Sequence, residues 1–61
     1  MQGTAGMWAE SKGYTVMPGY VDQTVSCLAS APPSFVCWVR TTAGRLFVEC
    51  QDGDHCTGRP E

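Results

Sequence analysis

The pattern of apolar and polar residues changes character near Tyr14. Before it, residues 1–13 contain three glycines and little periodicity, which predicts a flexible arm without a helix, with Trp8 lying against the domain or free as a contact residue. After it, residues 14–61 are rich in β-branched and aromatic residues, which predicts a single small β domain. The segments with strand character are Tyr14–Met17, Tyr20–Leu28, Phe35–Thr41 and Arg45–Cys50. The expected fold class is small all-β: a disulfide-stabilised antiparallel sheet, or a small barrel or sandwich, of four to five short strands.

The last two of these segments predict a hairpin whose turn midpoint lies between Ala43 and Gly44. One face of this hairpin carries Phe35 and three facing pairs, Cys37 with Cys50, Val39 with Val48, and Thr41 with Leu46. We predict that this is the core face, because a shift of one residue would place Glu49 opposite Cys37 and bring charge into the core.

The opposite face of the same hairpin carries Trp38, Arg40, Phe47 and Glu49. In this register Trp38 faces Glu49 and Arg40 faces Phe47. Aromatic residues and arginine are enriched at the centres of protein interfaces. These four residues therefore form a candidate partner-binding surface. The alternative is that a further strand or the N-terminal arm covers them and makes a second small core.

The chain contains four cysteines, Cys27, Cys37, Cys50 and Cys56, which can compensate for the low stability of a short chain. A domain of about 60 residues buries only about 60% of the surface of its unfolded chain, so chains of this length usually need disulfides, a metal or a partner for stability. The even number and the lack of a Cys-x-x-Cys motif favour two disulfides, which indicate an oxidising compartment and a secreted protein. The hairpin register predicts the pair Cys37–Cys50, which leaves Cys27 with Cys56.

The segment from Cys27 to Pro33 resembles the reactive loop of Bowman–Birk serine protease inhibitors. The residues of this possible inhibitory loop are Leu28, Ala29, Ser30, Ala31, Pro32 and Pro33, with Leu28 in the place of the family's threonine. The resemblance implies that Ala29 fills the specificity pocket of an elastase-like protease and that Ala29–Ser30 is the scissile bond. It also implies the pairing Cys27–Cys37, with Cys50–Cys56 as a local disulfide.

Charge and length narrow the possible partners. The formal charge of −2, with four basic residues, argues against nucleic-acid binding, and no apolar run approaches the ~20 residues of a membrane span. We expect no cofactor and no catalysis, because one histidine and a very short chain offer little for a closed active site. The predicted function is that of a small secreted binding protein, of inhibitor, toxin or effector type, whose partner is another protein; the oligomeric state is open. The alternative is an intracellular module with a structural zinc, held by four ligands from Cys27, Cys37, Cys50, His55 and Cys56.

Overall fold

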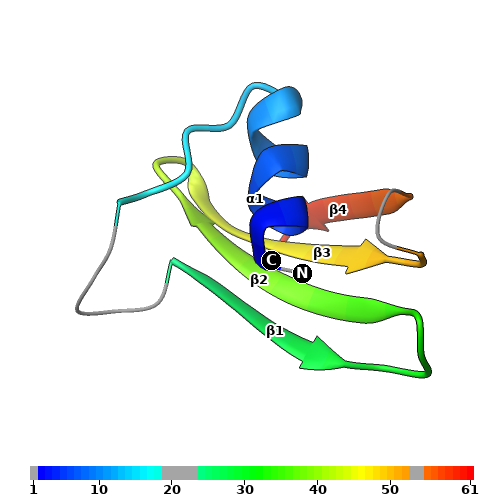
Figure 1. The fold of residues 1–61 in the computed structure, drawn as a ribbon. Coiled ribbons are helices and arrows are strands. Elements are labelled where there is room, and N and C mark those ends of the chain that lie inside the picture. The colour runs from blue at the N-terminus through cyan, green and yellow to red at the C-terminus, as the bar shows by residue number, and fades with distance from the viewer. Residues whose placement is uncertain (1, 19–23, 53–54) are drawn as a thin grey trace.

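One helix lies across one face of a four-stranded antiparallel sheet (Figure 1). The computed structural model describes residues 2–18, 24–52 and 55–61. Its elements are α1 Gln2–Ser11, β1 Val25–Ala29, β2 Phe35–Thr41, β3 Gly44–Cys50 and β4 Cys56–Pro60. The strands follow each other across the sheet in chain order, so the sheet is open, with β1 and β4 at its edges. The predicted small, disulfide-stabilised antiparallel β fold is confirmed.

The core lies between α1 and the sheet, on the face that the alternation in β2 and β3 predicts. The buried side chains of these two strands are Phe35, Cys37, Val39, Thr41, Leu46, Val48 and Cys50. Burial alternates along both strands, because successive side chains of a strand point to opposite faces. The predicted core face is therefore confirmed.

The predicted hairpin register is wrong by two residues. Cys37 lies opposite Val48, Val39 opposite Leu46, and Thr41 opposite Gly44. The loop is therefore Thr42–Ala43. A shift of two residues leaves every side chain on its face, so the hydrophobic pattern alone does not distinguish the two registers.

Local turn chemistry favours the observed register. Gly44 has a φ of 110°, a conformation that a residue with a β-carbon adopts only under strain. The Thr41 hydroxyl donates to the Gly44 carbonyl oxygen at 2.6 Å and accepts from the Ala43 N–H at 3.1 Å. The hydroxyl of this buried threonine thus closes the turn and is itself satisfied there.

Residues 2–11 form the helix α1, so the prediction of an N-terminal segment without a helix is wrong. Its buried positions are Ala5 and Ala9, one turn apart, both fully buried against the sheet. The helix ends at a Schellman motif, in which Gly13 N–H donates to the Glu10 carbonyl at 3.0 Å and Tyr14 N–H to that of Ala9 at 3.1 Å. Gly13 has the positive φ, 93°, that this ending requires.

Strand β4 was not predicted from the sequence. Its central residue is Gly58, a residue type that is uncommon in strands, and the packing of the helix explains why glycine is found there. A β-carbon built on Gly58 would lie 2.6 Å from the Trp8 ring and 3.2 Å from a methyl group of Val48. The indole of Trp8 therefore packs directly on the backbone of β4. Glycine weakens a strand by itself, but here it allows the helix to approach the sheet closely.

The segments before β1 are shorter than predicted. Within Tyr14–Met17 only Val16 forms a bridge, to Thr41, supported by a hydrogen bond from Met17 N–H to the Arg40 carbonyl at 2.9 Å. In the predicted strand Tyr20–Leu28, residues 20–23 lie outside the described residues, and the observed strand begins at Val25.

Two disulfides join neighbouring strands, Cys27–Cys37 between β1 and β2 and Cys50–Cys56 between β3 and β4. Each joins residues directly opposite in the ladder. The pairing Cys37–Cys50 with Cys27–Cys56 is therefore wrong, because it followed from the incorrect register. The pairing that the Bowman–Birk resemblance implied is the observed one. On the chain-entropy model the closed loops, with sequence separations of 10 and 6, stabilise the fold by about 2–3 kcal/mol each.

The contact between Trp8 and Gly58 gives a first testable prediction. Gly58→Ala should lower the free energy of unfolding by about 1–3 kcal/mol, because the Trp8 ring must leave its position on β4. Urea unfolding and the NMR signal of the Trp8 indole N–H measure this effect. The matched control is Gly3→Ala, where an added β-carbon has no neighbour within 4 Å and the helix should gain stability. Equal stability of Gly58→Ala and the natural chain would contradict the observed helix position.

The disulfide pairing gives a second prediction. Trypsin cleaves after Lys12, Arg40 and Arg45, while Arg59 is followed by Pro60. Digestion without reduction should therefore release peptides 13–40 and 46–61 separately, each about 2 Da lighter than its reduced form. A single linked species containing both peptides would show that the disulfides cross between the two hairpin strands.

Candidate functional site

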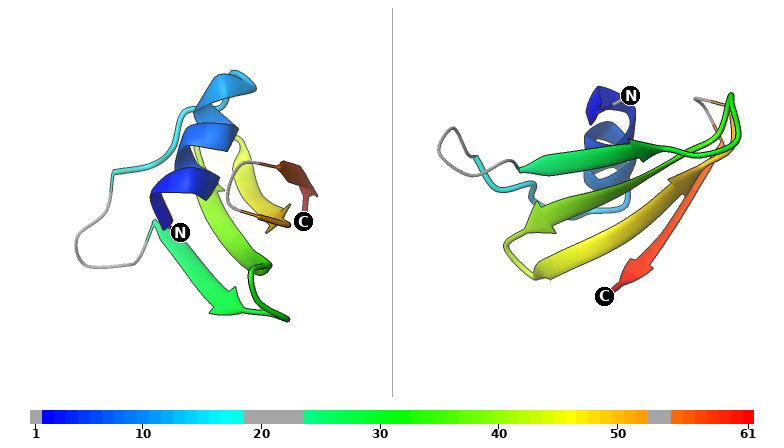
Figure 2. Two further views of the ribbon diagram at one scale, coloured as in Figure 1. Left: turned by 45° about the vertical axis from the view of Figure 1, so that its right-hand side comes forward. Right: turned by 90° about the horizontal axis from the view of Figure 1, so that it is seen from below.

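The second face of the sheet, here called the outer face, holds all four residues of the predicted binding surface. Its side chains come from alternate positions of the four strands: Ser26, Leu28, Val36, Trp38, Arg40, Arg45, Phe47, Glu49, Thr57 and Arg59. The helix α1 packs on the core face and therefore does not cover this surface, and the two views in Figure 2 show the helix on one side of the sheet. The alternative that the N-terminal segment covers these residues is thus wrong, and among residues 2–18, 24–52 and 55–61 no helix or strand lies over them.

An aromatic pair occupies the middle of the outer face. Trp38 and Phe47 are directly opposite each other on β2 and β3, with ring centroids 5.3 Å apart and planes at 57°. Both are half-buried. Beside them Val36 pairs with Leu28, whose side chain is 60% exposed. The predicted partners within the surface are corrected, since Trp38 faces Phe47 rather than Glu49.

Arg59 extends this surface onto β4 and was not among the predicted site residues. Its guanidinium lies over the Phe47 ring, 4.9 Å from the centroid, and 3.5 Å from a Glu49 carboxylate oxygen. The ring contact is a cation–π interaction, which holds the arginine on the aromatic pair. The alternation of Thr57 and Arg59 around Gly58 is the sequence signal that could have placed Arg59 here.

Charged side chains lie next to the aromatic pair, on the side of the hairpin turn. Arg40 and Arg45 are directly opposite each other, so Arg40 faces Arg45 and not Phe47 as predicted. Arg45 makes a two-pronged ion pair with Glu61, with nitrogen–oxygen distances of 2.8 and 3.2 Å. A hollow of about 230 Å³ lies beside them, lined by Ser26, Trp38, Arg40 and Arg45.

The possible inhibitory loop lies at the edge of the sheet. Leu28 and Ala29 end the edge strand β1, and residues 30–33 form the exposed connection to β2. Ser30 N–H donates to the Ser34 carbonyl at 3.2 Å and Ser34 N–H to that of Ala31 at 2.8 Å, which closes the connection. The disulfide Cys27–Cys37 ties its two ends together.

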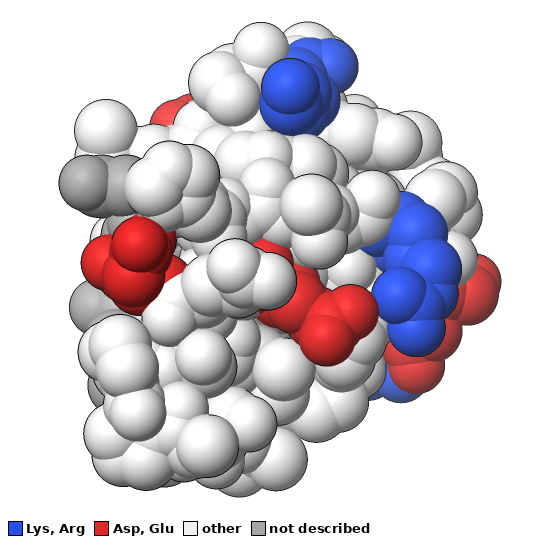
Figure 3. All heavy atoms as spheres, turned by 90° about the vertical axis from the view of Figure 1, so that its right-hand side faces the viewer, with Lys and Arg blue, Asp and Glu red and all other residues white. Residues whose placement is uncertain are grey.

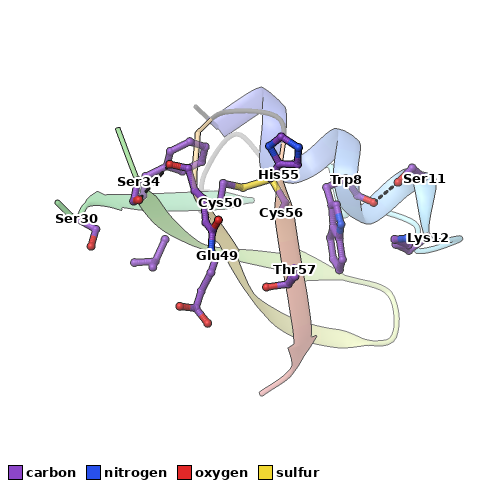
Figure 4. Close-up of a pocket in the computed structure, with 13 residues that line it drawn as sticks. Trp8, Ser11, Lys12, Ser30, Ser34, Glu49, Cys50, His55, Cys56 and Thr57 are labelled. Atoms are coloured by element: carbon purple, nitrogen blue, oxygen red, sulfur yellow. Dashed lines mark hydrogen bonds between the residues drawn. A yellow bond between two sulfur atoms is a disulfide. The ribbon is translucent and has the colours of Figure 1, made fainter. Parts of the chain in front are cut away.

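A second cleft, of about 750 Å³, runs around the end of the sheet where the β1–β2 and β3–β4 connections lie. Figure 4 shows Trp8 and Lys12 on one side of the Cys50–Cys56 disulfide, and Ser30 and Ser34 on the other. The exposed His55 ring nitrogen Nδ1 lies 2.7 Å from Asp52, and the Ser34 hydroxyl donates to the Gln51 carbonyl at 3.1 Å. From this end of the molecule, charged side chains stand as separate groups on an otherwise uncharged surface (Figure 3).

The zinc alternative does not agree with the structure. It requires thiolate ligands, whereas the sulfur atoms of Cys27, Cys37, Cys50 and Cys56 are bonded in pairs. His55, its fifth candidate ligand, pairs with Asp52. In the part of the chain that the structure describes, no three histidine, cysteine or acidic side chains gather as a metal site.

Comparisons of the chain with protein-family models, with curated proteins and with solved structures gave no match. Within the described residues, no helix has the length and apolar character needed to cross a membrane.

Proposed function

We propose that this protein is a small, non-catalytic binding protein that uses the outer face of its sheet to cover the surface of a partner protein. The observation that supports this most directly is the pair Trp38 and Phe47, which stands on a side of the sheet that α1 leaves exposed. Tryptophan and arginine are the residue types that contribute most binding energy at protein interfaces.

The construction of the face favours affinity. Its side chains project from strands that two disulfides hold together, so little conformational entropy is lost when a partner binds. In addition, the cation–π contact favours the position of Arg59 over Phe47 in the unbound protein.

Charge indicates the kind of partner. Three of the four basic residues of the chain, Arg40, Arg45 and Arg59, lie on the outer face, although the chain as a whole carries −2. Such a face complements a surface with an apolar centre and an acidic border. Disulfides persist in oxidising compartments, so we place this activity outside the cell, in the manner of an inhibitor, toxin or effector.

The test of this proposal is crosslinking from the outer face. A photoreactive phenylalanine at Val36 should trap a partner, and the same group at Met7, which is 71% exposed on α1, serves as the matched control. For the purified partner, Trp38→Ala should weaken binding by about 2 kcal/mol, or roughly 30-fold, and Met7→Ala should not.

A comparison of melting temperatures shows whether a loss of binding reflects a loss of folding. Trp38→Ala should lower the melting temperature less than Val48→Ala, whose side chain is fully buried. Trapping from Met7 but not from Val36, or unchanged affinity in folded Trp38→Ala, would contradict the proposal.

A second candidate function is inhibition of a serine protease by the Ala29–Ser30 segment. The observation that favours it is the disulfide Cys27–Cys37, the pairing that the Bowman–Birk resemblance requires. An exposed segment at the end of an edge strand also has the extended backbone that a protease binds.

This candidate predicts slow, stoichiometric inhibition of an elastase-type protease. Ala29→Arg should shift the preference to trypsin-like proteases, because the side chain in the specificity pocket selects the enzyme. Residual protease activity against inhibitor concentration measures both effects, with Ala31→Arg as the control. Rapid cleavage after Ala29, or equal effects of the two substitutions, would exclude inhibition by this bond.

A further inference from the structure

We infer that the edge of strand β1 is a dimerisation site, at which β1 pairs in antiparallel orientation with β1 of a second copy of this chain. The residues at the centre of the contact are Cys27, Leu28 and Ala29. This inference goes beyond the proposed binding function, and the two can be tested separately.

One side of β1, here called the open edge, points away from the rest of the sheet. The strand lies at the end of the strand order, with β2 as its neighbour, and within residues 2–18, 24–52 and 55–61 no strand pairs with its other side (Figure 1). An edge strand presents backbone N–H and C=O groups with which another strand can pair. The open edge of β1 is therefore a site where a further strand can be added.

The hydrogen bond just beyond β1 shows which backbone groups face the open edge. Ser30 N–H donates to the Ser34 carbonyl at 3.2 Å, one position past the ladder pair of Ala29 with Phe35. Hydrogen-bonded and non-hydrogen-bonded pairs alternate along an antiparallel ladder. The even-numbered residues of β1 therefore bond to β2, and the N–H and C=O groups of Cys27 and Ala29 point to the open edge.

The inference needs only the backbone of these two residues. Val25 and Ser26 have further interactions, so the start of the strand is not used. Within the described part of the chain, no backbone group of another segment bonds to Cys27 or Ala29 at the open edge.

A two-fold axis beside Leu28 uses all of these groups. Cys27 then lies opposite Ala29 of the second copy, and Ala29 opposite its Cys27, and each pair exchanges both N–H to C=O hydrogen bonds. Leu28 lies opposite Leu28 of the second copy in a non-hydrogen-bonded pair, where side chains approach closely. The Leu28 side chain is 60% exposed, and this contact covers part of it.

The composition of the two edges favours self-pairing at β1. No charged residue occurs in residues 24–39, so two copies of β1 meet without like charges opposite each other. The other edge strand, β4, carries the charge of Arg59, and Pro60 has no N–H to donate. Charges and prolines are the features that protect edge strands from pairing, and β1 has neither.

We expect this dimer to be weak, and it changes how the outer face is presented. A contact limited to a strand of five residues is smaller than the ~1,200–2,000 Å² of stable complexes. Because the axis is perpendicular to the sheet, the outer faces of both copies lie on the same side of one continuous sheet. Ala29 is paired in the dimer, so protease inhibition by the Ala29–Ser30 bond would require the monomer.

The test measures self-association of the whole, oxidised protein without any partner. Sedimentation equilibrium from about 10 µM to about 1 mM should show a mass that rises from that of the monomer toward that of the dimer. Over the same range, ¹⁵N NMR should show that the N–H groups of Cys27 and Ala29 become protected from hydrogen exchange. Leu28 N–H, which bonds to β2, is the internal control and should be protected throughout.

Variants locate the contact. Leu28→Glu should raise the dissociation constant of the dimer about tenfold or more, because two carboxylates then lie opposite each other. Met7→Glu is the matched control, since Met7 is 71% exposed on α1 and the change in charge is the same. Ala29→Pro should also weaken the dimer, because it removes an N–H at the open edge.

A mixture of two variants tests the position of the axis. Leu28→Glu and Leu28→Lys should each be monomeric alone and should associate when mixed, because residue 28 lies opposite itself and the opposite charges attract. Failure of the mixture to associate would exclude an axis at Leu28.

Other results would also overturn the inference. A protein that stays monomeric at about 1 mM would leave the edge to a strand of another protein. A dimer that persists in Leu28→Glu but is lost in Trp38→Ala would place the contact on the outer face. The inference can fail while the photoreactive group at Val36 still traps a different protein, because the mass of the crosslinked product distinguishes a second copy from another partner.

Discussion

A sheet has two faces, and the part of this chain that the structure describes has one short helix to cover them. Everything else in the structure depends on where that helix packs. Ala5 and Ala9 lie fully buried on one face, and Trp8 reaches across it to the bare backbone of Gly58. This close approach closes the core against β4. The second face is left with an aromatic pair that nothing in α1 contacts, and such a surface on a small protein is typical of a binding site.

The sequence predicted the central strands of the sheet well, but it did not predict the helix that covers the sheet. The segment Phe35–Thr41 is a strand with the predicted bounds, because alternation and β-branched residues act locally. The helix was missed because its buried positions are alanines among glycines, which produce no apolar stripe. Strand β4 was missed because Gly58 and Pro60 look like loop residues. The glycine in β4 is explained by a tertiary contact, Trp8 on Gly58, between residues far apart in sequence.

The same limits applied to the candidate site. Successive residues of a strand point to opposite faces of the sheet, so the face of each residue follows from its position in the strand. The sequence therefore grouped four residues correctly on one face: Trp38, Arg40, Phe47 and Glu49. Their pairing depends on register, and a two-residue shift changes every neighbour without changing the face. That error also produced the wrong disulfides. Arg59 and Glu61, whose ion pairs complete the charged border, required β4 to be in place before they could be found.

The central claim is that α1 covers one face of the sheet and that, within residues 2–18, 24–52 and 55–61, no helix or strand covers the other. Paramagnetic relaxation by a neutral gadolinium chelate, measured on the methyl groups, tests it most directly. The predicted result is strong relaxation of Leu28 and Val36 on the outer face and weak relaxation of Val39 and Val48 beneath α1. Equal protection of the two sets of methyl groups would show that the outer face is covered in solution, and would contradict the account.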